Sequence, residues 1–478
     1  MTKYDNLING EWVSFGNYND NVNPSDTNDV IGSYSYGDAS SVARAVEAAQ
    51  AARDSWANST PQARHDLLDA VGNALAARSS EFGALLAREE GKTLAEGVGE
   101  TMRASQVFKF FAGEALRVAG ELQTSVRPDI DVEITREPVG IVGLITPWNF
   151  PIAIPAWKIA PALAYGNCVI LKPADLTPAC AHVIATLLHE NGCPAGVFNL
   201  VMGRGSTVGE AIVTHPDIDA ISFTGSVGTG HHIAEVCGKM QKKVQLEMGG
   251  KNPMVVLDDA DLSVAVSACL NGTFFSTGQR CTASSRLIVQ EGIHDAFVAE
   301  LSKQMQALKV GDARDPDTQI GPVVDEKQLK SNLEYIELAR KEAGEVIGGE
   351  RLELDAPGFY QAPALFLGTD NSMRINREEI FGPCGSVIKV ADLEEAISVA
   401  NDTDFGLSAG ICTTSLKSAR TFKRRAEAGM VMVNLPTAGV DYHVPFGGRK
   451  GSSFGPREQG RYAVEFYTTV KTSYVFAG

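Results

Sequence analysis

The chain has 478 residues, 44% of them hydrophobic, and a formal net charge of −16. This length predicts two or three domains, because one hydrophobic core rarely supports so many residues, and the negative charge argues against nucleic acid or an anionic membrane surface as a partner. The eight cysteines are scattered without metal-ligand or disulfide spacing and the chain begins without an apolar leader, so we expect a cytoplasmic protein with no metal site.

The first 120 residues are expected to form an edge hairpin followed by a layer of helices. Short apolar pieces between 7 and 35, separated by Gly and Asn turns, predict the hairpin. Residues 39–57 are rich in alanine with charges at helical spacing, and 60–78 begin with Thr-Pro, the residue types of an N-cap and a first helical position. Helical patterns continue through 80–90 and 92–118.

Two other segments have the character of strands. In 121–135 apolar Ile130, Val132 and Ile134 alternate with polar residues, and the tail 464–476 is also strand-like. The first is expected to be a half-buried or exposed strand. We expect these two arms to pair with each other or with another subunit.

From Pro138 onward strands and helices alternate. The run 138–157 is the longest uncharged, mostly apolar stretch, but its four prolines cannot continue a membrane-spanning helix, so we expect buried strand and loop there. A first series then has expected strands at 141–145, 166–171, 196–201, 220–224 and 243–246 and helices at 159–164, 177–191, 206–214 and 228–237. In a second series the expected helices are 261–272, 294–307, 327–343, 393–400 and 416–428 and the strands 286–290, 364–367 and 430–434. This alternation predicts parallel sheet with helices on both faces.

One cysteine stands out as a candidate nucleophile. In the segment 276–284, Cys281 follows a Gly-Gln pair and lies beside Arg280. A thiol is nucleophilic only as the thiolate, and a neighbouring cation lowers its pKa. From this segment alone, an inert buried cysteine is the alternative.

Two segments suit a nucleotide. The turn 223–230 follows an apolar strand and opens a helix, so its backbone amides are expected to face a phosphate, although its glycine spacing is not G-x-G-x-x-G and a plain tight turn is the alternative. Lys172 and Asp175 end another strand, where they suit ribose hydroxyls or a phosphate, or form a solvated charge pair.

Three further segments carry polar groups at turns. Glu247 ends an apolar strand before two glycines and is either a general base of raised pKa or a surface charge. Asn149 lies between two prolines and either donates to a developing oxyanion or satisfies loop backbone. The acidic pair at 378–379 enters a Gly-Pro turn, which in isolation is a helix-to-strand connection.

Seven motifs, taken together and in order, resemble those of the NAD(P)-dependent aldehyde dehydrogenase superfamily. They are Pro-Trp-Asn-Phe-Pro at 147–151, Leu-Lys-Pro-Ala-Asp at 171–175, Phe-Thr-Gly-Ser at 223–226, Glu-Met-Gly-Gly-Lys at 247–251, Gly-Gln-Arg-Cys at 278–281, Glu-Glu-Ile-Phe-Gly-Pro at 378–383 and Pro-Phe-Gly-Gly-Arg-Lys at 445–450. The resemblance extends from Ile8 to Tyr474.

The resemblance implies roles for four catalytic residues. Cys281 attacks the aldehyde carbonyl, and the side-chain amide of Asn149 with the backbone N–H of Cys281 holds the oxyanion. After hydride transfer leaves a thioester, Glu247 activates the water that releases a carboxylic acid. Glu458 matches a second carboxylate on the proton route. Because acyl-CoA-forming members usually lack the glutamate at 247, its presence favours hydrolysis to the free acid.

The resemblance also implies NAD or NADP as the cofactor. Lys172 and Asp175 match adenosine-ribose contacts, Glu379 matches a nicotinamide-ribose contact, and Gly225 and Ser226 lie by the pyrophosphate. The remaining implied cofactor contacts are Trp148 and Phe381. Many NAD-preferring members have glutamate at 175, and the shorter aspartate here favours NAD while leaving NADP open.

For the substrate, the segments 279–286 and 441–460 resemble semialdehyde dehydrogenases that oxidise 2-oxoglutarate semialdehyde (2,5-dioxopentanoate). Succinate semialdehyde is the alternative, although Ala283 stands where its enzymes often have a second cysteine, and other short acidic aldehydes, including sulfonated ones, stay open. A structural or binding protein of the same fold is disfavoured because the three principal catalytic residues are present. The candidate pocket residues are Phe111, Phe150, Trp157, Arg280, Ser285 and Phe446. The candidate cations for a substrate carboxylate are Arg103, Lys109 and Arg280.

The fold implied is the three-part α/β aldehyde dehydrogenase fold. The expected parts are a Rossmann-like cofactor domain at 1–122 and 139–247 with a late segment near 448–460, a second α/β catalytic domain at 248–447, and a small β oligomerisation arm at 123–138 and 461–478. The arm adds to a partner's sheet, which predicts a homodimer or a homotetramer.

Overall fold

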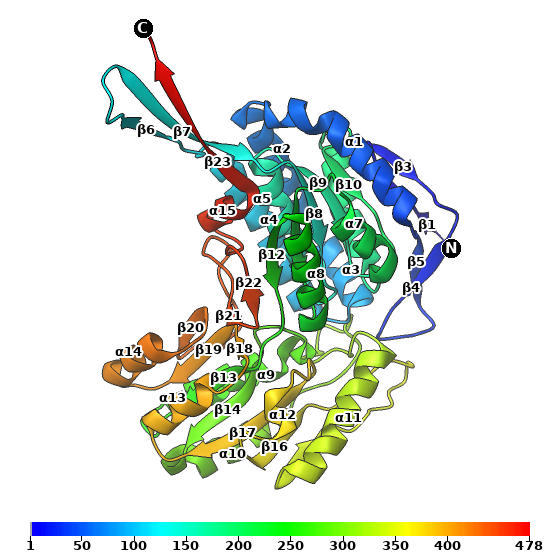
Figure 1. Cartoon of the computed structure of the whole chain (residues 1–478). Helices are drawn as coiled ribbons and strands as arrows, with labels where there is room; N and C mark the ends of the chain where they lie inside the picture. Colours follow the sequence, from blue (N-terminus) through cyan, green and yellow to red (C-terminus); the bar gives the residue numbers. More distant parts are fainter. Residues whose placement is uncertain (1) are drawn as a thin grey trace.

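The strands that follow Pro138 form the centre of an eight-stranded sheet in a computed structural model that describes residues 2–478 (Figure 1). The sheet has the order β22-β12-β11-β8-β9-β10-β2-β3, and its five central strands are parallel. β8, β9 and β11 are buried along their whole length, which explains their continuous apolar sequences. The strand bounds are β2 Asn6–Ile8, β3 Glu11–Val13, β8 Ile141–Ile145, β9 Cys168–Lys172, β10 Phe198–Leu200, β11 Ala220–Thr224, β12 Lys243–Glu247 and β22 Ser453–Phe454.

Chain order along this sheet reverses between β8 and β11. The next strand in the chain after β8 lies on one side of it, and β11 lies on the other. In open α/β sheets the crevice at such a switch point, outside the carboxyl ends of the strands, is where ligands bind. The loops that leave β8 and β11 are therefore the first place to search for a site.

Helices cover both faces of the first sheet (Figure 1). The predicted caps are present, since Thr60 accepts a hydrogen bond from the N–H of Ala63 and Pro61 opens α2. One face carries α1 Ala39–Ala57, α7 Glu210–Thr214 and α8 Val227–Met240, and the other carries α2 Pro61–Ala77, α3 Ser79–Glu89, α4 Leu94–Ala115, α5 Ala153–Ala164 and α6 Pro178–Glu190. The first turn of the predicted helix at 206–214 is a π-helix at Gly205–Gly209.

The expectation of strand and loop throughout 138–157 is wrong at its end. α5 begins at Ala153 and contains Pro155 and Pro161. Pro155 lies in the first helical turn, where the backbone N–H has no intrahelical partner, so its missing donor is not needed. Among residues 2–478, no helix combines the length and apolar character that crossing a bilayer requires.

The eight-stranded sheet with its helices is the first lobe of the molecule. A seven-stranded sheet, in the order β15-β16-β17-β14-β13-β19-β20, forms the second lobe. Its strands are β13 Asn252–Val256, β14 Ser284–Gln290, β15 Glu345–Gly348, β16 Ala364–Thr369, β17 Cys384–Val390, β19 Ser408–Cys412 and β20 Met430–Val433. Its helices are α9 Leu262–Phe274, α10 Glu291–Gln306, α11 Glu326–Glu342, α12 Arg374–Arg377, α13 Leu393–Asn401 and α14 Leu416–Arg425. β13, β15, β17 and β19 are absent from the sequence expectations, because prolines, glycines and small polar residues interrupt their apolar patterns.

Short elements complete the fold. They are β1 Lys3–Tyr4, β4 Tyr18–Val22 and β5 Val30–Ser35 in a three-stranded sheet, the pair β18 Phe405–Gly406 and β21 Arg449–Lys450, the 3-10 helices at Phe275–Gly278 and Arg461–Ala463, and α15 Val464–Tyr467. The predicted hairpin between 7 and 35 is β2–β3, at the edge of the first sheet.

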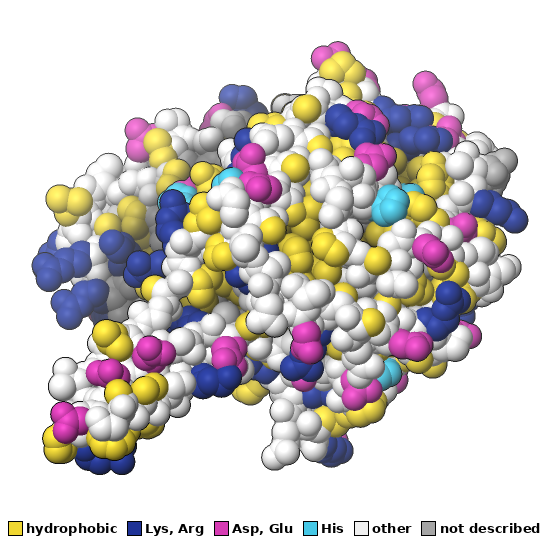
Figure 2. Space-filling model, turned by 90° about the horizontal axis from the view of Figure 1, so that it is seen from above, with side chains coloured by type: hydrophobic (Ala, Val, Ile, Leu, Met, Phe, Trp, Pro, Cys, Tyr) yellow, Lys and Arg dark blue, Asp and Glu magenta, His cyan; other side chains and the backbone are white. Residues whose placement is uncertain are grey.

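A ribbon of three strands projects from the first lobe (Figure 1). The two predicted arms do pair, because β23 Thr468–Phe476 runs antiparallel to β7 Ile130–Pro138 along its whole length. The segment 121–135 is a hairpin rather than one strand, with β6 Glu121–Thr124 preceding β7, and the first four residues of the strand-like tail are the helix α15. Figure 2 views the molecule from this end and shows hydrophobic side chains exposed among charged ones.

The connectivity supports our proposed domain boundaries without fixing them. β12 ends the first sheet at Glu247, and β13 begins the second at Asn252. β22 returns to the first sheet beside β12, in keeping with the proposed late segment at 448–460, although β21 within that segment pairs with β18. We retain 1–122 with 139–247 and 248–447 as the proposed domains.

We expect the chain to assemble through its arm into a homodimer or a homotetramer. The side chains of Tyr474 and Phe476 are 61% and 66% exposed. Exposed apolar side chains on an edge strand favour packing against a sheet of another subunit. Light scattering at micromolar concentration should give at least twice the chain mass of 50.9 kDa. The double variant Tyr474→Lys, Phe476→Lys should lower that mass. Leu416→Lys, at a leucine on α14 that is 88% exposed, should leave it unchanged, and a monomeric native protein would contradict the expectation.

Candidate active site

A cleft of about 310 Å³ lies where the strand order of the first sheet reverses. The loops after β8 and β11 of the first lobe line it on one side, and residues of the second lobe line it on the other. Seven of the predicted site residues line it, namely Trp148, Asn149, Gly225, Ser226, Cys281, Glu379 and Phe381. The other lining residues are Pro147, Ile154, Thr224, Met248, Gly249, Gln328, Ser331, Tyr335 and Ile380.

The turn before Cys281 has an unusual backbone. Ser276, Thr277 and Gly278 all have left-handed conformations, with φ of 51°, 55° and 64°. The two non-glycine residues cost on the order of 1–3 kcal/mol each in such a conformation. Gly278 is required there, since a Cβ would lie 2.0 Å from the carbonyl oxygen of Gly382. The strain is sustained only because the surroundings hold this turn.

Charged side chains of α4 and the turn before it hold both loops of the cleft. Glu96 Oε1 accepts from the N–H and the hydroxyl of Ser276 at 2.7 and 2.9 Å. Glu100 Oε1 accepts from the N–H groups of Ile152 and Ala153 at 2.9 and 3.0 Å. Lys92 pairs with Glu100 at 2.5 Å and donates to the carbonyl oxygen of Asn149 at 2.8 Å. One helix end therefore sets the position of Asn149 relative to Cys281.

The expected activation of Cys281 by Arg280 is wrong for this structure. Arg280 donates to Asn271 Oδ1 at 3.4 Å and lies 3.7 Å from Glu96. Burial raises the pKa of the Cys281 thiol well above its usual range, and the carboxylates of Glu379 and Glu247 raise it further. The backbone N–H groups of Cys281 and Thr282 act in the opposite direction. The resting thiol is therefore protonated at neutral pH.

Two asparagines fix the backbone around Cys281. Asn149 Nδ2 donates to the carbonyl oxygen of Gln279 at 3.0 Å and is buried, which leaves its second N–H for another acceptor. Asn252 Nδ2 donates to the carbonyl oxygens of Cys281 and Ala283 at 2.8 and 2.9 Å. These contacts fix the side-chain amide of Asn149 and the backbone of Cys281 within the cleft lining.

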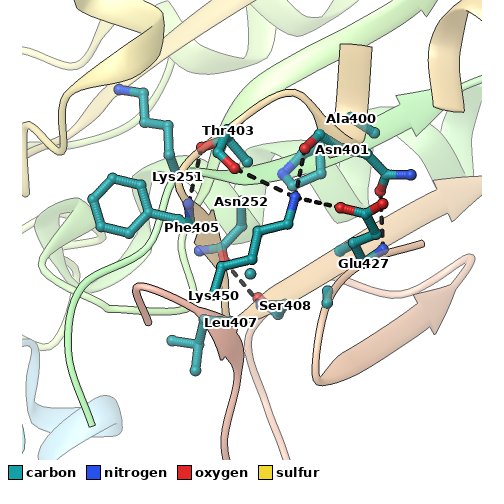
Figure 3. Close-up of a pocket in the computed structure, with 14 residues that line it drawn as sticks. Lys251, Asn252, Ala400, Asn401, Thr403, Phe405, Leu407, Ser408, Glu427 and Lys450 are labelled. Atoms are coloured by element: carbon teal, nitrogen blue, oxygen red, sulfur yellow. Dashed lines mark hydrogen bonds and ion pairs between the residues drawn. The ribbon is translucent and has the colours of Figure 1, made fainter. Parts of the chain in front are cut away.

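Figure 3 shows the region on the other side of Asn252, where its Oδ1 accepts from the N–H of Ser408 at 3.0 Å. Lys450 crosses this hollow, pairs with Glu427 at 2.6 Å and donates to the carbonyl oxygen of Asn401 at 2.6 Å. The remaining space is about 10 Å³, enough for one water molecule at most. This region therefore has a structural role next to the loop that carries Cys281.

Glu247 and Glu458 are buried ends of one hydrogen-bonded chain. Glu247 accepts from Ser453 Oγ at 2.5 Å and from Gln245 Nε2 at 3.3 Å. Ser222 Oγ donates to Gln245 Oε1 at 2.7 Å and accepts from Lys158 Nζ, which also pairs with Glu458. Burial and the Glu458 carboxylate raise the pKa of Glu247 well above its usual range. Neither carboxylate lines the cleft, although the charge of Glu247 acts on Cys281.

The other end of the cleft suits a nucleotide. The side chain of Ser226 makes no capping hydrogen bond at the start of α8, which leaves the first N–H groups of that 14-residue helix for an anion. Glu379 accepts from the N–H of Gly250 at 2.8 Å, and burial raises its pKa to about 7. Lys172 pairs with Asp175 at 2.7 Å outside the cleft lining. The residues present fit a dinucleotide.

Of the candidate substrate residues, Trp157 and Phe446 lie on the Cys281 side of the site, whereas Phe111 belongs to the first core. Trp157 stacks on Phe446 with ring centroids 5.4 Å apart, and Cys281 packs against the cluster that contains Phe446. The Phe150 ring lies 4.0 Å from Lys92 Nζ. Phe111, in contrast, is fully buried in the first core beside Tyr165. Ser285 belongs to β14 and its hydroxyl has no hydrogen-bond partner among residues 2–478.

Sequence reasoning missed several residues that shape this site. Gln328, Ser331 and Tyr335 project from one face of α11 into the cleft at helical spacing. The anchors Lys92, Glu96 and Glu100 have a detectable signal, because charges four residues apart stand beside the capping box of Thr93. Only the packed structure shows that these charges point inward. Within residues 2–478 there is no group of three or more His, Cys, Asp or Glu side chains arranged to hold a metal.

Comparisons with known proteins agree with one another. The sequence model of the aldehyde dehydrogenase family matches residues 12–473. An alpha-ketoglutaric semialdehyde dehydrogenase of Bacillus subtilis is 44% identical over 99% of this chain and 98% of its own, and an alpha-ketoglutarate semialdehyde dehydrogenase of Haloferax volcanii is 43% identical over 98% of each. The crystal structure of a Staphylococcus aureus betaine aldehyde dehydrogenase with NAD+ gives a TM-score of 0.97 at 35% identity, covering 99% of this chain and 95% of that one.

Because its pKa is raised, the Cys281 thiol should react slowly with iodoacetamide at pH 7. We expect a rate at least about tenfold below that of free cysteine, rising as the pH increases through and above the ordinary range for thiols. Mass spectrometry of the digested protein would assign the label, with Cys281→Ser as the control. Labelling of Cys281 at the free-cysteine rate at pH 7 would show that its surroundings do not favour the thiol.

Proposed function

Because the chain belongs to the aldehyde dehydrogenase family, we propose that its cleft oxidises an aldehyde to the free acid with a nicotinamide dinucleotide, using Cys281 as the nucleophile. The observation that carries this proposal is the cleft itself, in which Cys281, Asn149, Glu379 and the turn at Gly225 meet at the switch point of the first sheet. All eight cysteines are free thiols in the described chain, which supports a reducing compartment such as the cytoplasm.

In the first step the Cys281 thiol gives its proton to water in the cleft, and its sulfur bonds to the aldehyde carbon. The carbonyl oxygen becomes an oxyanion, to which the free N–H of Asn149 and the backbone N–H of Cys281 donate. The bound cofactor supplies the hydride acceptor. The protein holds the adduct against that acceptor. Trp148 and Phe381 contribute to this as an edge-to-face aromatic pair in the cleft lining, with ring centroids 5.4 Å apart.

Release of the acid needs a base other than Cys281, which is then acylated. Glu247 takes a proton from water, the hydroxyl adds to the thioester carbon, and the carbon–sulfur bond breaks. Its raised pKa makes Glu247 a stronger base than a surface carboxylate. The hydrogen-bonded chain through Ser222 and Lys158 supports a role for Glu458 in carrying that proton away.

We propose NAD as the preferred cofactor, with NADP as the weaker alternative. Asp175 lies beside Lys172 at the carboxyl end of β9, where the adenosine ribose of a dinucleotide is expected. Its carboxylate accepts from a 2′-hydroxyl and repels a 2′-phosphate. The NAD+ complex of the S. aureus relative, which shares the fold at 35% identity, supports the same choice.

The substrate we propose is 2-oxoglutarate semialdehyde, oxidised to 2-oxoglutarate. The support comes from three relatives at 39–44% identity whose names state that activity, one of them a 2,5-dioxopentanoate dehydrogenase of Saccharolobus solfataricus. Succinate semialdehyde and other short acidic aldehydes are the alternatives within the same chemistry. A purified enzyme assayed at 340 nm with each aldehyde and each cofactor would separate them.

Cys281→Ala should abolish aldehyde oxidation and retain cofactor binding. Glu247→Gln should form about one NADH per subunit in a burst and then turn over at least about 100-fold more slowly than the native enzyme, since the thioester accumulates. Stopped-flow absorbance at 340 nm measures both phases. Cys193→Ala, at a half-buried cysteine that is not among the cleft-lining residues, is the matched control and should turn over normally. Steady turnover by either test variant at the native rate would refute its assigned role.

Asp175→Ser should shift the cofactor preference toward NADP. Removing the carboxylate removes its repulsion of a 2′-phosphate, so the ratio of kcat/KM for NADP to that for NAD should rise by about tenfold. Steady-state kinetics with both cofactors at one aldehyde concentration would measure it. Asp317→Ser, at an exposed aspartate of the second lobe, should leave the ratio unchanged. An unaltered ratio in Asp175→Ser would place the ribose elsewhere.

A further inference from the structure

We infer that Arg103 binds the substrate carboxylate and so selects acidic aldehydes. This inference rests on the proposed function, because it presupposes an aldehyde that carries an acid group. The sequence left three cations for this role, and the contacts in the structure separate them.

Arg103 lies on the face of α4 that supports the cleft. It follows Glu96 by seven residues and Glu100 by three, a spacing that places all three on one side of a helix. Glu96 holds the turn before Cys281, and Glu100 holds the backbone just after Asn149. The next residue along this face therefore points toward the region between the two catalytic loops.

A short series of contacts connects Arg103 to the aromatic side of Cys281. Arg103 Nη2 donates to Gln459 Oε1 at 3.3 Å. The neighbouring residue Glu458 exchanges two backbone hydrogen bonds with Phe446, at 2.7 and 3.0 Å. Phe446 stacks on Trp157, and Cys281 packs against its cluster. These contacts place Arg103 on the Phe446 and Trp157 side of Cys281, whereas most of the residues proposed to hold the nucleotide line the cleft.

Among the described residues, two buried hydrogen-bond donors of this region lack an acceptor, beside one buried acceptor, Glu458 Oε2, that lacks a donor. Arg103 forms no ion pair with any described residue, although burial acts on its guanidinium strongly enough to lower its pKa. Gln459 Nε2 and Trp157 Nε1 are buried and have no acceptor among residues 2–478. Unsatisfied buried donors are rare, and a carboxylate is a pure acceptor with up to four sites. The region is therefore suited to an anionic ligand.

The other two cations are already committed elsewhere. Lys109 is exposed, and its stem lies against Gly72 on α2. Arg280 is held by Glu96 and Asn271. Asp441 and Glu100 both act on Arg103 electrostatically. Asp441 is exposed and forms no ion pair with Arg103, and Glu100 is paired with Lys92. Of the candidate cations, Arg103 alone is half-buried and forms no ion pair with a described residue.

The test compares an acidic with an uncharged aldehyde in matched variants. For Arg103→Met we expect kcat/KM for 2-oxoglutarate semialdehyde to fall by about 100-fold, mainly through a higher KM, because a buried charge pair loses one partner. The value for pentanal, a five-carbon aldehyde without a charge, should be unchanged or higher. Arg103→Lys should restore part of the loss, and Lys109→Met should match the native enzyme. Equal losses for both aldehydes, or a KM for the semialdehyde within about threefold of native, would overturn the inference.

A binding measurement keeps the test independent of turnover. Titration calorimetry of Cys281→Ala with the product 2-oxoglutarate should give a Kd that rises about 100-fold when Arg103→Met is added, while NAD binding is retained as the measure of an intact fold. If the native enzyme and every Arg103 variant prefer the semialdehyde, the role of Arg103 is refuted and the proposed function stands. A native enzyme that prefers pentanal would refute the proposed substrate and this inference together.

Discussion

The ion pair between Lys92 and Glu100, buried beside Glu96, is the interaction on which the site depends. Taking such charges out of water is unfavourable unless each finds partners, and here the partners are the backbones of both catalytic loops. The two loops come from different lobes, yet one helix end positions both. The left-handed turn at Ser276 and Thr277 persists because Glu96 holds it, so strain at the nucleophile and charge burial on α4 are two parts of one arrangement.

The electrostatics around Cys281 favour an unreactive resting thiol. The carboxylates of Glu247 and Glu379 both raise the pKa of the thiol, and burial raises the pKa of all three groups. A cationic nicotinamide ring in the cleft would oppose that effect, since an opposite charge stabilises the thiolate. Reactivity would then appear only when the hydride acceptor is in place, which protects the thiol from side reactions while the enzyme is free.

Much of this architecture was predictable because local pattern and burial agree in the first sheet. The expected strands 141–145 and 220–224 coincide with β8 and β11, whose continuous apolar runs are buried on both faces. The second sheet was harder, since β13 begins at Asn-Pro and β19 contains Ala-Gly, and their strand identity comes from the neighbours they pair with. Candidate residues emerged from motifs, but the direction of Arg280 and the lack of an ion-pair partner for Arg103 are properties of packing between distant segments.

The segment 446–460 has a consequence for the way the molecule unfolds. Within it β21 pairs with β18 of the second lobe, and β22 pairs with β12 of the first. Two lobes with separate cores would ordinarily melt as independent units, but here two neighbouring strands of one segment pair with strands of different lobes. We therefore expect the two lobes to unfold together, with the cleft between them lost in the same transition.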